Sequence, residues 1–234
     1  MQANEAAWYD EFYQKEQASW PPWYKFALPF LQKNLSAQSR LVELGCGQGH
    51  LLRHLAKAGL LPEENIHGMD QSRTAIDLVK RHLPKAQLET GDIYQLPYPK
   101  NFFHICLLME TIEHLEDPHP ALLQMFSVIA PGGFLLVSFP NFLSPPWLPF
   151  RLFLQLIGKA ERYIALQPID KIYTVFHVIS LVKKAGFEFD HGIGSGYGPP
   201  FFYRFEKDWM TRGLNALGLW WLSFHPILVF RKRN

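Results

Sequence analysis

From Arg40 onward the chain alternates short apolar runs with amphipathic stretches, and this alternation constrains the fold more than any other feature. Such a pattern is typical of a parallel sheet with helices on both faces. The apolar run 103–109 is expected to be a central strand buried on both faces. The expected strands are 40–45, 66–70, 87–90, 103–109, 134–139, 187–191 and 226–232. The expected helices are 48–58, the stretch after the capping residue Ser72, 119–129, 174–185 and 206–217.

Length and composition narrow the class of protein. At 234 residues the chain fits one domain, or one domain with an insertion. Its 23 basic and 21 acidic residues give a net charge of +2, and 19% charged residues argue against disorder and against a basic nucleic-acid binder. The cysteines Cys46 and Cys106 are too few for a disulfide framework or a four-cysteine zinc site.

The expected location of the protein is the cytoplasm. The N-terminal sequence has neither the basic nor the apolar region of a secretory signal. The longest apolar stretch, 213–230, is interrupted by Asn215, Ser223, His225 and Pro226, whereas a membrane span needs about 20 mostly apolar residues.

The sharpest local motif is the stretch 43–49, Glu-Leu-Gly-Cys-Gly-Gln-Gly, at an expected strand-to-helix turn. Glycines permit a tight turn and a close approach of a ligand, and the next helix offers free N–H groups. A nicotinamide site normally has G-x-G-x-x-G, whereas these glycines fall at 45, 47 and 49. The motif therefore predicts a ligand site of another kind, with a glycine turn that binds nothing as the alternative.

The order of the motifs resembles that of the class I S-adenosylmethionine-dependent methyltransferases. Their first motif is an acidic residue followed by G-x-G-x-G, as in 43–49. Further matches follow in the family's order at Gly68-Met69-Asp70-Gln71-Ser72, Gly91-Asp92-Ile93, Leu96-Pro97-Tyr98, Asn101-Phe102-Phe103, Ala130-Pro131-Gly132-Gly133-Phe134 and Lys184-Ala185-Gly186-Phe187. The resemblance implies a Rossmann-like, seven-stranded, mostly parallel sheet with an antiparallel last strand.

The resemblance also implies a cofactor, S-adenosyl-L-methionine, and residues that bind it. Asp70 is expected to accept hydrogen bonds from the ribose hydroxyls, Asp92 to contact the adenine, and Glu43 to favour the ammonium group directly or through water. Both aspartates also fit ordinary turn positions. The expected cofactor-binding residues are Glu43, Gly45, Cys46, Gly47, Gly49, Asp70, Gln71, Asp92, Ile93 and Met109.

A second polar cluster, Glu110-Thr111-Ile112-Glu113-His114, follows the strand 103–109. It is similar to the E-x-x-E-H stretch of the quinone-biosynthesis O-methyltransferases. His114 is the candidate general base, because histidine ordinarily titrates near neutral pH, and Glu113 is the second catalytic candidate. A divalent metal held by Glu110, Glu113 and His114, or a purely structural role, are the alternatives.

Two segments lie outside the strand–helix alternation. Residues 141–170 exceed the usual connection of about 2–6 residues, and residues 1–35 carry Trp8, Tyr9, Phe12 and Tyr13 on one helical face. We predict one domain, 1–234, in which 1–35 forms a lid and 141–170 an insertion over an apolar acceptor pocket. Packing on the sheet is the simpler alternative for both aromatic sets, which include Phe142, Trp147, Phe150 and Phe153.

The sequence thus predicts methyl transfer to a small, largely apolar acceptor, more on oxygen than on nitrogen or carbon. One alternative is a membrane-associated lipid or quinone methyltransferase that uses 142–157 or 213–221 as an interfacial helix, with Arg151 and Lys159 flanking the first. The other is a catalytically silent, methyltransferase-like partner protein. A small-molecule acceptor and peripheral membrane contact are the partners considered, and nucleic acid is not expected.

Overall fold

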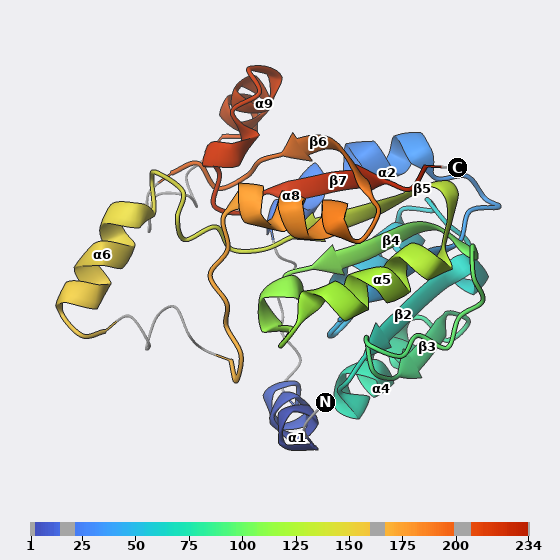
Figure 1. Ribbon diagram of the computed structural model, residues 1–234. Helices are drawn as coiled ribbons and strands as arrows, with labels where there is room; N and C mark the ends of the chain where they lie inside the picture. Colours follow the sequence, from blue (N-terminus) through green and yellow to red (C-terminus); the bar gives the residue numbers. More distant parts are fainter. Residues whose placement is uncertain (1–2, 15–21, 160–166, 199–206, 234) are drawn as a thin grey trace.

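The computed structural model describes residues 3–14, 22–159, 167–198 and 207–233. At its centre lies a seven-stranded sheet with the strand order β3-β2-β1-β4-β5-β7-β6 (Figure 1). The first five strands pair in parallel, whereas β7 inserts between β5 and β6 and runs antiparallel to both. The expected fold class is therefore confirmed. The strands are β1 (Leu41–Leu44), β2 (Ile66–Asp70), β3 (Gln87–Thr90), β4 (Phe103–Met109), β5 (Ile129–Ser138), β6 (Glu188–Ile193) and β7 (Ile227–Arg231).

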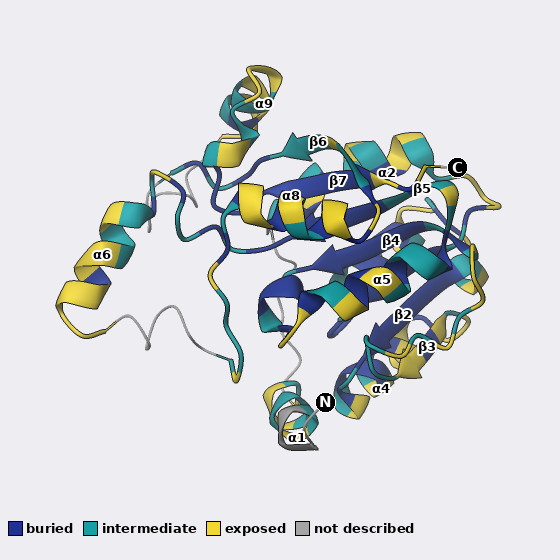
Figure 2. Cartoon of the chain, in the orientation of Figure 1, coloured by how far each residue is buried: buried dark blue, intermediate teal, exposed yellow. Residues whose placement is uncertain are grey.

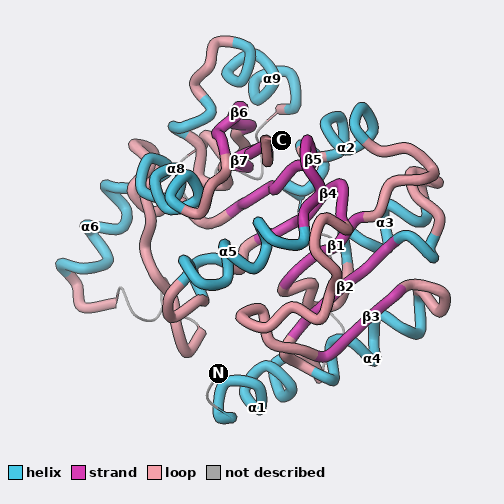
Figure 3. Tube along the Cα trace, turned by 45° about the vertical axis from the view of Figure 1, so that its right-hand side comes forward, coloured by secondary structure: helices cyan, strands magenta, loops and turns pink. Residues whose placement is uncertain are grey.

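The helices connect and cover these strands, as the trace in Figure 3 shows. The α-helices are α1 (Ala3–Phe12), α2 (Leu28–Asn34), α3 (His50–Lys57), α4 (Arg73–His82), α5 (Pro118–Val128), α6 (Leu148–Leu156), α8 (Val175–Lys184) and α9 (Asp208–Ala216). Short 3-10 helices are η1 (Pro22–Phe26), η2 (Glu63–Asn65), η3 (Ile112–His114) and η5 (Trp220–Leu222). No helix in the described ranges is long and apolar enough to cross a membrane.

The sheet buries side chains on both faces, which explains the nearly unbroken apolar run of β4. Successive side chains of a strand point to opposite faces. Cys106 and Leu108 accordingly join the core under α5 and α8, while Ile105 and Leu107 join the core under α2, α3 and α4. The expected helices on both faces are thus present, and the N-cap of α4 is Ser72, whose Oγ accepts a hydrogen bond from the Ala75 amide.

The largest departure from the expected elements is at β5. The helix expected at 119–129 ends at Val128, and the strand expected at 134–139 begins already at Ile129. Pro131-Gly132-Gly133 therefore does not separate two elements but lies within the strand. A register shift between Phe103 and Ile105 in the pairing with β4 accommodates these residues, and Gly132 takes a positive φ of 79°.

The buried Lys232 ties the end of β7 to the start of β5. Its Nζ donates hydrogen bonds to the carbonyl oxygens of Phe126 at 2.6 Å and Ile129 at 2.8 Å, and to Oδ1 of Asn101 at 2.9 Å. We expect Lys232→Met to lower the free energy of unfolding by about 2 kcal/mol, because it leaves buried acceptors without a donor. Urea unfolding measures this, with the exposed Lys184→Met as the matched control. Equal midpoints for the two variants would contradict the assignment.

Candidate active site

A cleft opens where the first four strands end. It encloses about 950 Å³, including space open to solvent. Its floor comes from the carboxyl ends of β1 and β2 and from the segments after β3 and β4, at the point where the sheet order reverses between β1 and β4. Parallel sheets bind ligands at this position. The lining residues are Tyr9, Tyr13, Leu44, Gly45, Met69, Asp70, Gln71, Gly91, Ile93, Tyr94, Glu110, Thr111, His114, Leu115, Glu116, Gln167, Pro168 and Ile169.

Each glycine of the 43–49 motif occupies a position where a side chain would not fit. All three have φ between 49° and 72°, a region that side chains rarely adopt. A Cβ on Gly45 would lie 2.5 Å from Thr111 Oγ1, one on Gly47 2.9 Å from the Tyr13 hydroxyl oxygen, and one on Gly49 2.6 Å from Val79. Gly45 therefore lets the segment after β4 approach, Gly47 lets the N-terminal segment approach, and Gly49 lets α3 pack on α4.

Asp70 is the last residue of β2. It contacts the glycine turn and also lines the cleft. Its Oδ2 accepts a hydrogen bond from the Gly47 amide at 2.8 Å, and its Oδ1 accepts one from the Ser72 amide at 2.9 Å. Burial raises the pKa of Asp70 to about 6, so the carboxyl remains largely ionised at neutral pH. Each oxygen keeps a second lone pair, and the residue lines the cleft.

Glu43 lies behind the cleft surface, on β1. It is buried, and its Oε2 has no hydrogen-bond partner among the described residues. Burial, together with the nearby Asp70, raises the pKa of Glu43 to about 8. A buried acceptor that lacks a partner normally has a reason, such as a group that binds there.

The raised pKa of Glu43 makes stability depend on pH. The unfolded chain releases this proton near pH 4.5 and the folded chain only near pH 8, so the folded state binds more protons between these values. Stability is therefore expected to fall as pH rises through this window and to level off above it. Urea unfolding across the window should show a smaller fall for Glu43→Gln, which carries no titrating proton. Parallel curves for the two proteins would contradict this assignment.

His114 faces the cleft from η3, and its surroundings define its tautomer. Its Nδ1 lies 2.7 Å from the carbonyl oxygen of Ile169 and 3.4 Å from Oδ1 of Asp170. A carbonyl oxygen only accepts, so Nδ1 carries the hydrogen and Nε2 of the neutral ring keeps its lone pair. The sequence analysis missed Asp170, because 56 residues of chain separate it from His114 and only folding brings them together.

Glu113 is buried next to His114 and does not line the cleft. Its Oε1 lies 3.7 Å from Nε2 of His114. Burial, with Glu110 and Asp170 nearby, raises the pKa of Glu113 well above its usual range. This environment disfavours the charged form of the Glu113 carboxyl beside His114.

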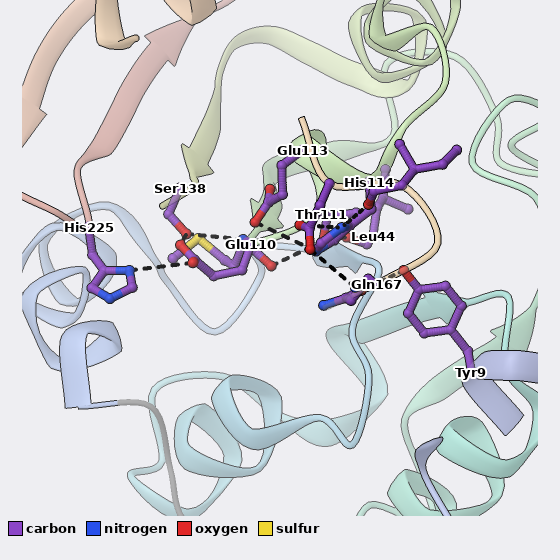
Figure 4. Close-up of polar contacts among 12 residues, drawn as sticks. Tyr9, Leu44, Glu110, Thr111, Glu113, His114, Ser138, Gln167 and His225 are labelled. Carbon is purple, nitrogen blue, oxygen red and sulfur yellow. Dashed lines mark hydrogen bonds and ion pairs between the residues drawn. The ribbon is translucent and has the colours of Figure 1, made fainter. Parts of the chain in front are cut away.

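Glu110 does line the cleft, and a separate set of contacts holds it (Figure 4). Ser138 Oγ donates to its Oε1 at 2.8 Å, and Nδ1 of His225 lies 3.4 Å from its Oε2. The His225 ring stacks on Trp23, 3.8 Å between centroids. Within the described ranges no three His, Cys, Asp or Glu side chains come together as a metal-holding group. Glu110, Glu113 and His114 are thus not arranged as the metal site considered from sequence.

The N-terminal segment closes one side of the cleft. Asp10 Oδ1 accepts hydrogen bonds from Ser72 Oγ at 2.6 Å and from the Thr74 amide at 3.0 Å, which fastens α1 to the start of α4. The Tyr9 hydroxyl donates to Oε1 of Gln167 at 2.5 Å across the cleft. The lid expected from residues 1–35 and the end of 141–170 therefore meet over the lining residues, whereas residues 15–21 and 160–166 lie outside the described ranges.

The insertion residues described before the gap, 141–159, do not line the cleft. Trp147 stacks on Phe224, 3.7 Å between centroids, and Phe142 also packs on Phe224. Phe153 is 54% exposed, so neither the expected pocket nor packing on the sheet buries this side chain. Of the described insertion, Gln167, Pro168 and Ile169 reach the cleft.

Some of the remaining expected cofactor residues line the cleft, and others do not. Gln71 and Ile93 line the cleft, whereas Cys46, Asp92 and Met109 do not. Asp92 Oδ1 accepts a hydrogen bond from the Tyr94 amide at 2.9 Å, a local turn contact. Tyr94 and Leu115 are lining residues that no sequence motif indicated. Thr111 also lines the cleft; it lies within the polar cluster 110–114, although no role was expected for it.

The strand order, the antiparallel β7 and a ligand cleft at the β1–β4 reversal define the class I methyltransferase fold. Residues 42–137 match the family model described as "Methyltransferase domain". Over this segment the chain is similar to S-adenosylmethionine-dependent methyltransferases, and it has their class I fold.

Individual relatives are distant. A ubiquinone biosynthesis O-methyltransferase of Coxiella burnetii is 30% identical over 146 residues, 60% of this chain and 58% of that protein. An uncharacterized methyltransferase of Schizosaccharomyces pombe is 28% identical over 126 residues, 49% of this chain and 45% of that protein. A solved Thermotoga maritima protein, titled a SAM-dependent methyltransferase and possible histamine N-methyltransferase, has a TM-score of 0.63 at 16% identity, covering 90% of this chain and 95% of that one. The chain thus spans about half the length of these two curated relatives.

Proposed function

We propose that this protein transfers the methyl group of S-adenosylmethionine to a hydroxyl of a small, uncharged, largely apolar acceptor. The observation that carries this proposal is the Nδ1 contact of His114 with the Ile169 carbonyl, which leaves Nε2 free to accept a proton at the cleft. A base of this kind acts on a hydroxyl, whose oxygen becomes a better nucleophile as its proton leaves.

The residues present fit the cofactor. Asp70 has free lone pairs at the cleft for two ribose hydroxyls, and Gly45 allows close approach of the backbone. The unpartnered Oε2 of the buried Glu43 matches a cationic ammonium, reached directly or through water. Asp92 and Ile93 remain the proposed adenine contacts. Gln71 lines the cleft beside them, while Cys46, Gly47, Gly49 and Met109 lie behind its surface and support the turn and the end of β4.

The chain's own groups account for proton movement. When bound, S-adenosylmethionine supplies a methyl group on a sulfonium sulfur, which leaves as a thioether. Nε2 of His114 takes the hydroxyl proton, and the Asp170 carboxyl, 3.4 Å from Nδ1, favours the resulting imidazolium. Beyond this proton transfer, the protein has to align the acceptor oxygen with the methyl group and exclude water.

The charge of the cleft narrows the acceptor class. Asp70, Glu110 and Glu116 line it, and none of its described lining residues is Lys or Arg. An acceptor that carries a carboxylate or phosphate would meet repulsion without a compensating cation. Aromatic and aliphatic side chains such as Tyr9, Ile93 and Leu115 make up much of the remaining wall, which favours a neutral acceptor with apolar surface.

Calorimetric titration with S-adenosylhomocysteine tests the proposal. Wild type should bind, and Asp70→Ala should bind much more weakly because the ribose loses its acceptor. Absence of binding by wild type would overturn the enzyme reading and favour a catalytically silent partner protein. An untargeted screen of cell extract with methyl-labelled cofactor then identifies the product, and a labelled amine rather than an ether would overturn the hydroxyl assignment.

We expect the lid to close further when ligands bind. The Tyr9–Gln167 hydrogen bond and the Asp10 contacts with α4 are few, so α1 can open at modest cost. Limited proteolysis should show slower cleavage within 1–20 and 160–170 when S-adenosylhomocysteine is present. Equal cleavage rates with and without it would mean that these segments are ordinary packing and not a lid.

A further inference from the structure

Helix α6 (Leu148–Leu156) is held to the domain by one side only. The buried Trp147, just before its first turn, stacks on Phe224 and donates from Nε1 to the Gly198 carbonyl oxygen at 3.1 Å. Within the helix, Leu154 is 4% exposed and so faces the domain. These contacts fix the inner face of α6 against the loops that precede β7.

The outer face of α6 is apolar as well. Apart from Gln155, the exposed side chains at 152–157 are large and aliphatic or aromatic: Leu152 at 54%, Phe153 at 54%, Leu156 at 86% and Ile157 at 43%. Figures 1 and 2 show the helix standing out from the sheet with this face open. A surface helix of a globular domain normally presents polar residues outward, and a contiguous exposed apolar face marks an interaction site.

The charged residues of the described segment that contains α6 are of one sign. Residues 141–159 contain Arg151 and Lys159 and no Asp or Glu. Helix α9 makes a useful contrast: it also exposes Trp209 and Leu217, but its first residue is Asp208, which pairs with Lys25. An apolar face flanked only by basic side chains is complementary to anionic lipid headgroups over an acyl layer.

The dimensions of α6 indicate how it meets such a surface. Nine residues span about 13.5 Å, well short of the roughly 30 Å of a bilayer core. A helix of this length cannot cross a bilayer, but it is long enough to lie in the plane of an interface. The chain that leaves α6 returns at Gln167, Pro168 and Ile169, which line the cleft.

We propose that the outer face of α6, formed by Leu152, Phe153, Leu156 and Ile157, docks on anionic membrane surfaces. Docking buries these side chains at the boundary of headgroups and acyl chains, and Lys159 lies among the headgroups. The proposal concerns binding alone and does not depend on methyl transfer.

Co-sedimentation of the full chain with lipid vesicles, without cofactor, tests this surface. One set of vesicles contains phosphatidylcholine with phosphatidylglycerol, and the other phosphatidylcholine alone. The variants are Leu156→Gln and the triple variant Leu152→Gln, Phe153→Gln, Leu156→Gln. Leu123→Gln on α5, where the leucine is 46% exposed, is the matched control. Circular dichroism and thermal unfolding show that each variant is folded, as expected for exposed positions.

Wild type and Leu123→Gln should bind the mixed vesicles alike, the single variant severalfold more weakly and the triple variant at least about tenfold more weakly. Added salt should weaken binding, because it screens the basic side chains. Failure of wild type to bind, an equal loss in Leu123→Gln, or equal binding to phosphatidylcholine alone would each overturn the proposal. A wild-type dimer that the triple variant converts to a monomer, without vesicle binding, would assign the face to a second copy instead.

Discussion

Gly47→Val is expected to weaken S-adenosylhomocysteine binding at least about tenfold, which corresponds to roughly 1.4 kcal/mol, while leaving the sheet folded. The φ of Gly47 is 49°, which a β-branched residue adopts only under strain. Its new Cβ would lie 2.9 Å from the Tyr13 hydroxyl oxygen. The substitution therefore displaces Tyr13 from the cleft wall and moves the Gly47 amide that orients Asp70. Calorimetric titration measures the change in affinity.

Gly59→Val separates this local effect from backbone strain. Gly59 follows α3, has a φ of 65°, and a Cβ there would meet no atom within 4 Å. Both variants are thus strained in the backbone, but only Gly47→Val intrudes on the site. If the two lose affinity equally, or if folded Gly47→Val binds like wild type, the cofactor does not lie against this turn.

His114→Ala is expected to lower turnover by about 10²–10⁴, the usual loss for a general base, with little change in S-adenosylhomocysteine affinity. In the proposed arrangement His114 acts on the acceptor from its place in the cleft lining, whereas Asp70 and Gly45 bind the cofactor. Transfer of labelled methyl groups to acceptors in cell extract measures turnover, and calorimetry measures cofactor affinity in the same preparations.

Two companion variants sharpen this result. Asp170→Asn keeps the shape beside Nδ1 but removes the charge that favours the imidazolium, so a smaller loss with an altered pH profile is expected. His119→Ala, on α5 and outside the cleft lining, should behave like wild type. Turnover of His114→Ala within a few-fold of wild type would show that positioning alone carries the reaction.

Much of the fold was predictable from the sequence because its signals are local. The alternating apolar and amphipathic runs determine strands and helices by periodicity, and β2, β3 and β4 have the predicted bounds. The glycines of 43–49 and Asp70 were recognisable because a turn at a strand end demands particular residue types at fixed spacing. The start of β5 was not predictable: Pro131-Gly132-Gly133 reads locally as a turn, and only pairing with β4 and β7 draws it into a strand.

The site required tertiary structure wherever its parts come from distant segments. His114 is recognisable as a candidate base, but its tautomer depends on Ile169 and Asp170, which reach it only when the insertion folds back. The same holds for Tyr9 with Gln167, whose contact spans 158 positions in the chain. The apolar stretch 142–157 is a second example. Its sequence indicates hydrophobicity, but only the fold decides which side chains are buried. Trp147 and Leu154 are buried, whereas Leu152 and Leu156 are exposed. Periodicity thus determined the strands and helices, and residue type marked the glycine turn. The pairing of distant side chains decided the surroundings of His114, the Tyr9–Gln167 contact and the exposed face of α6.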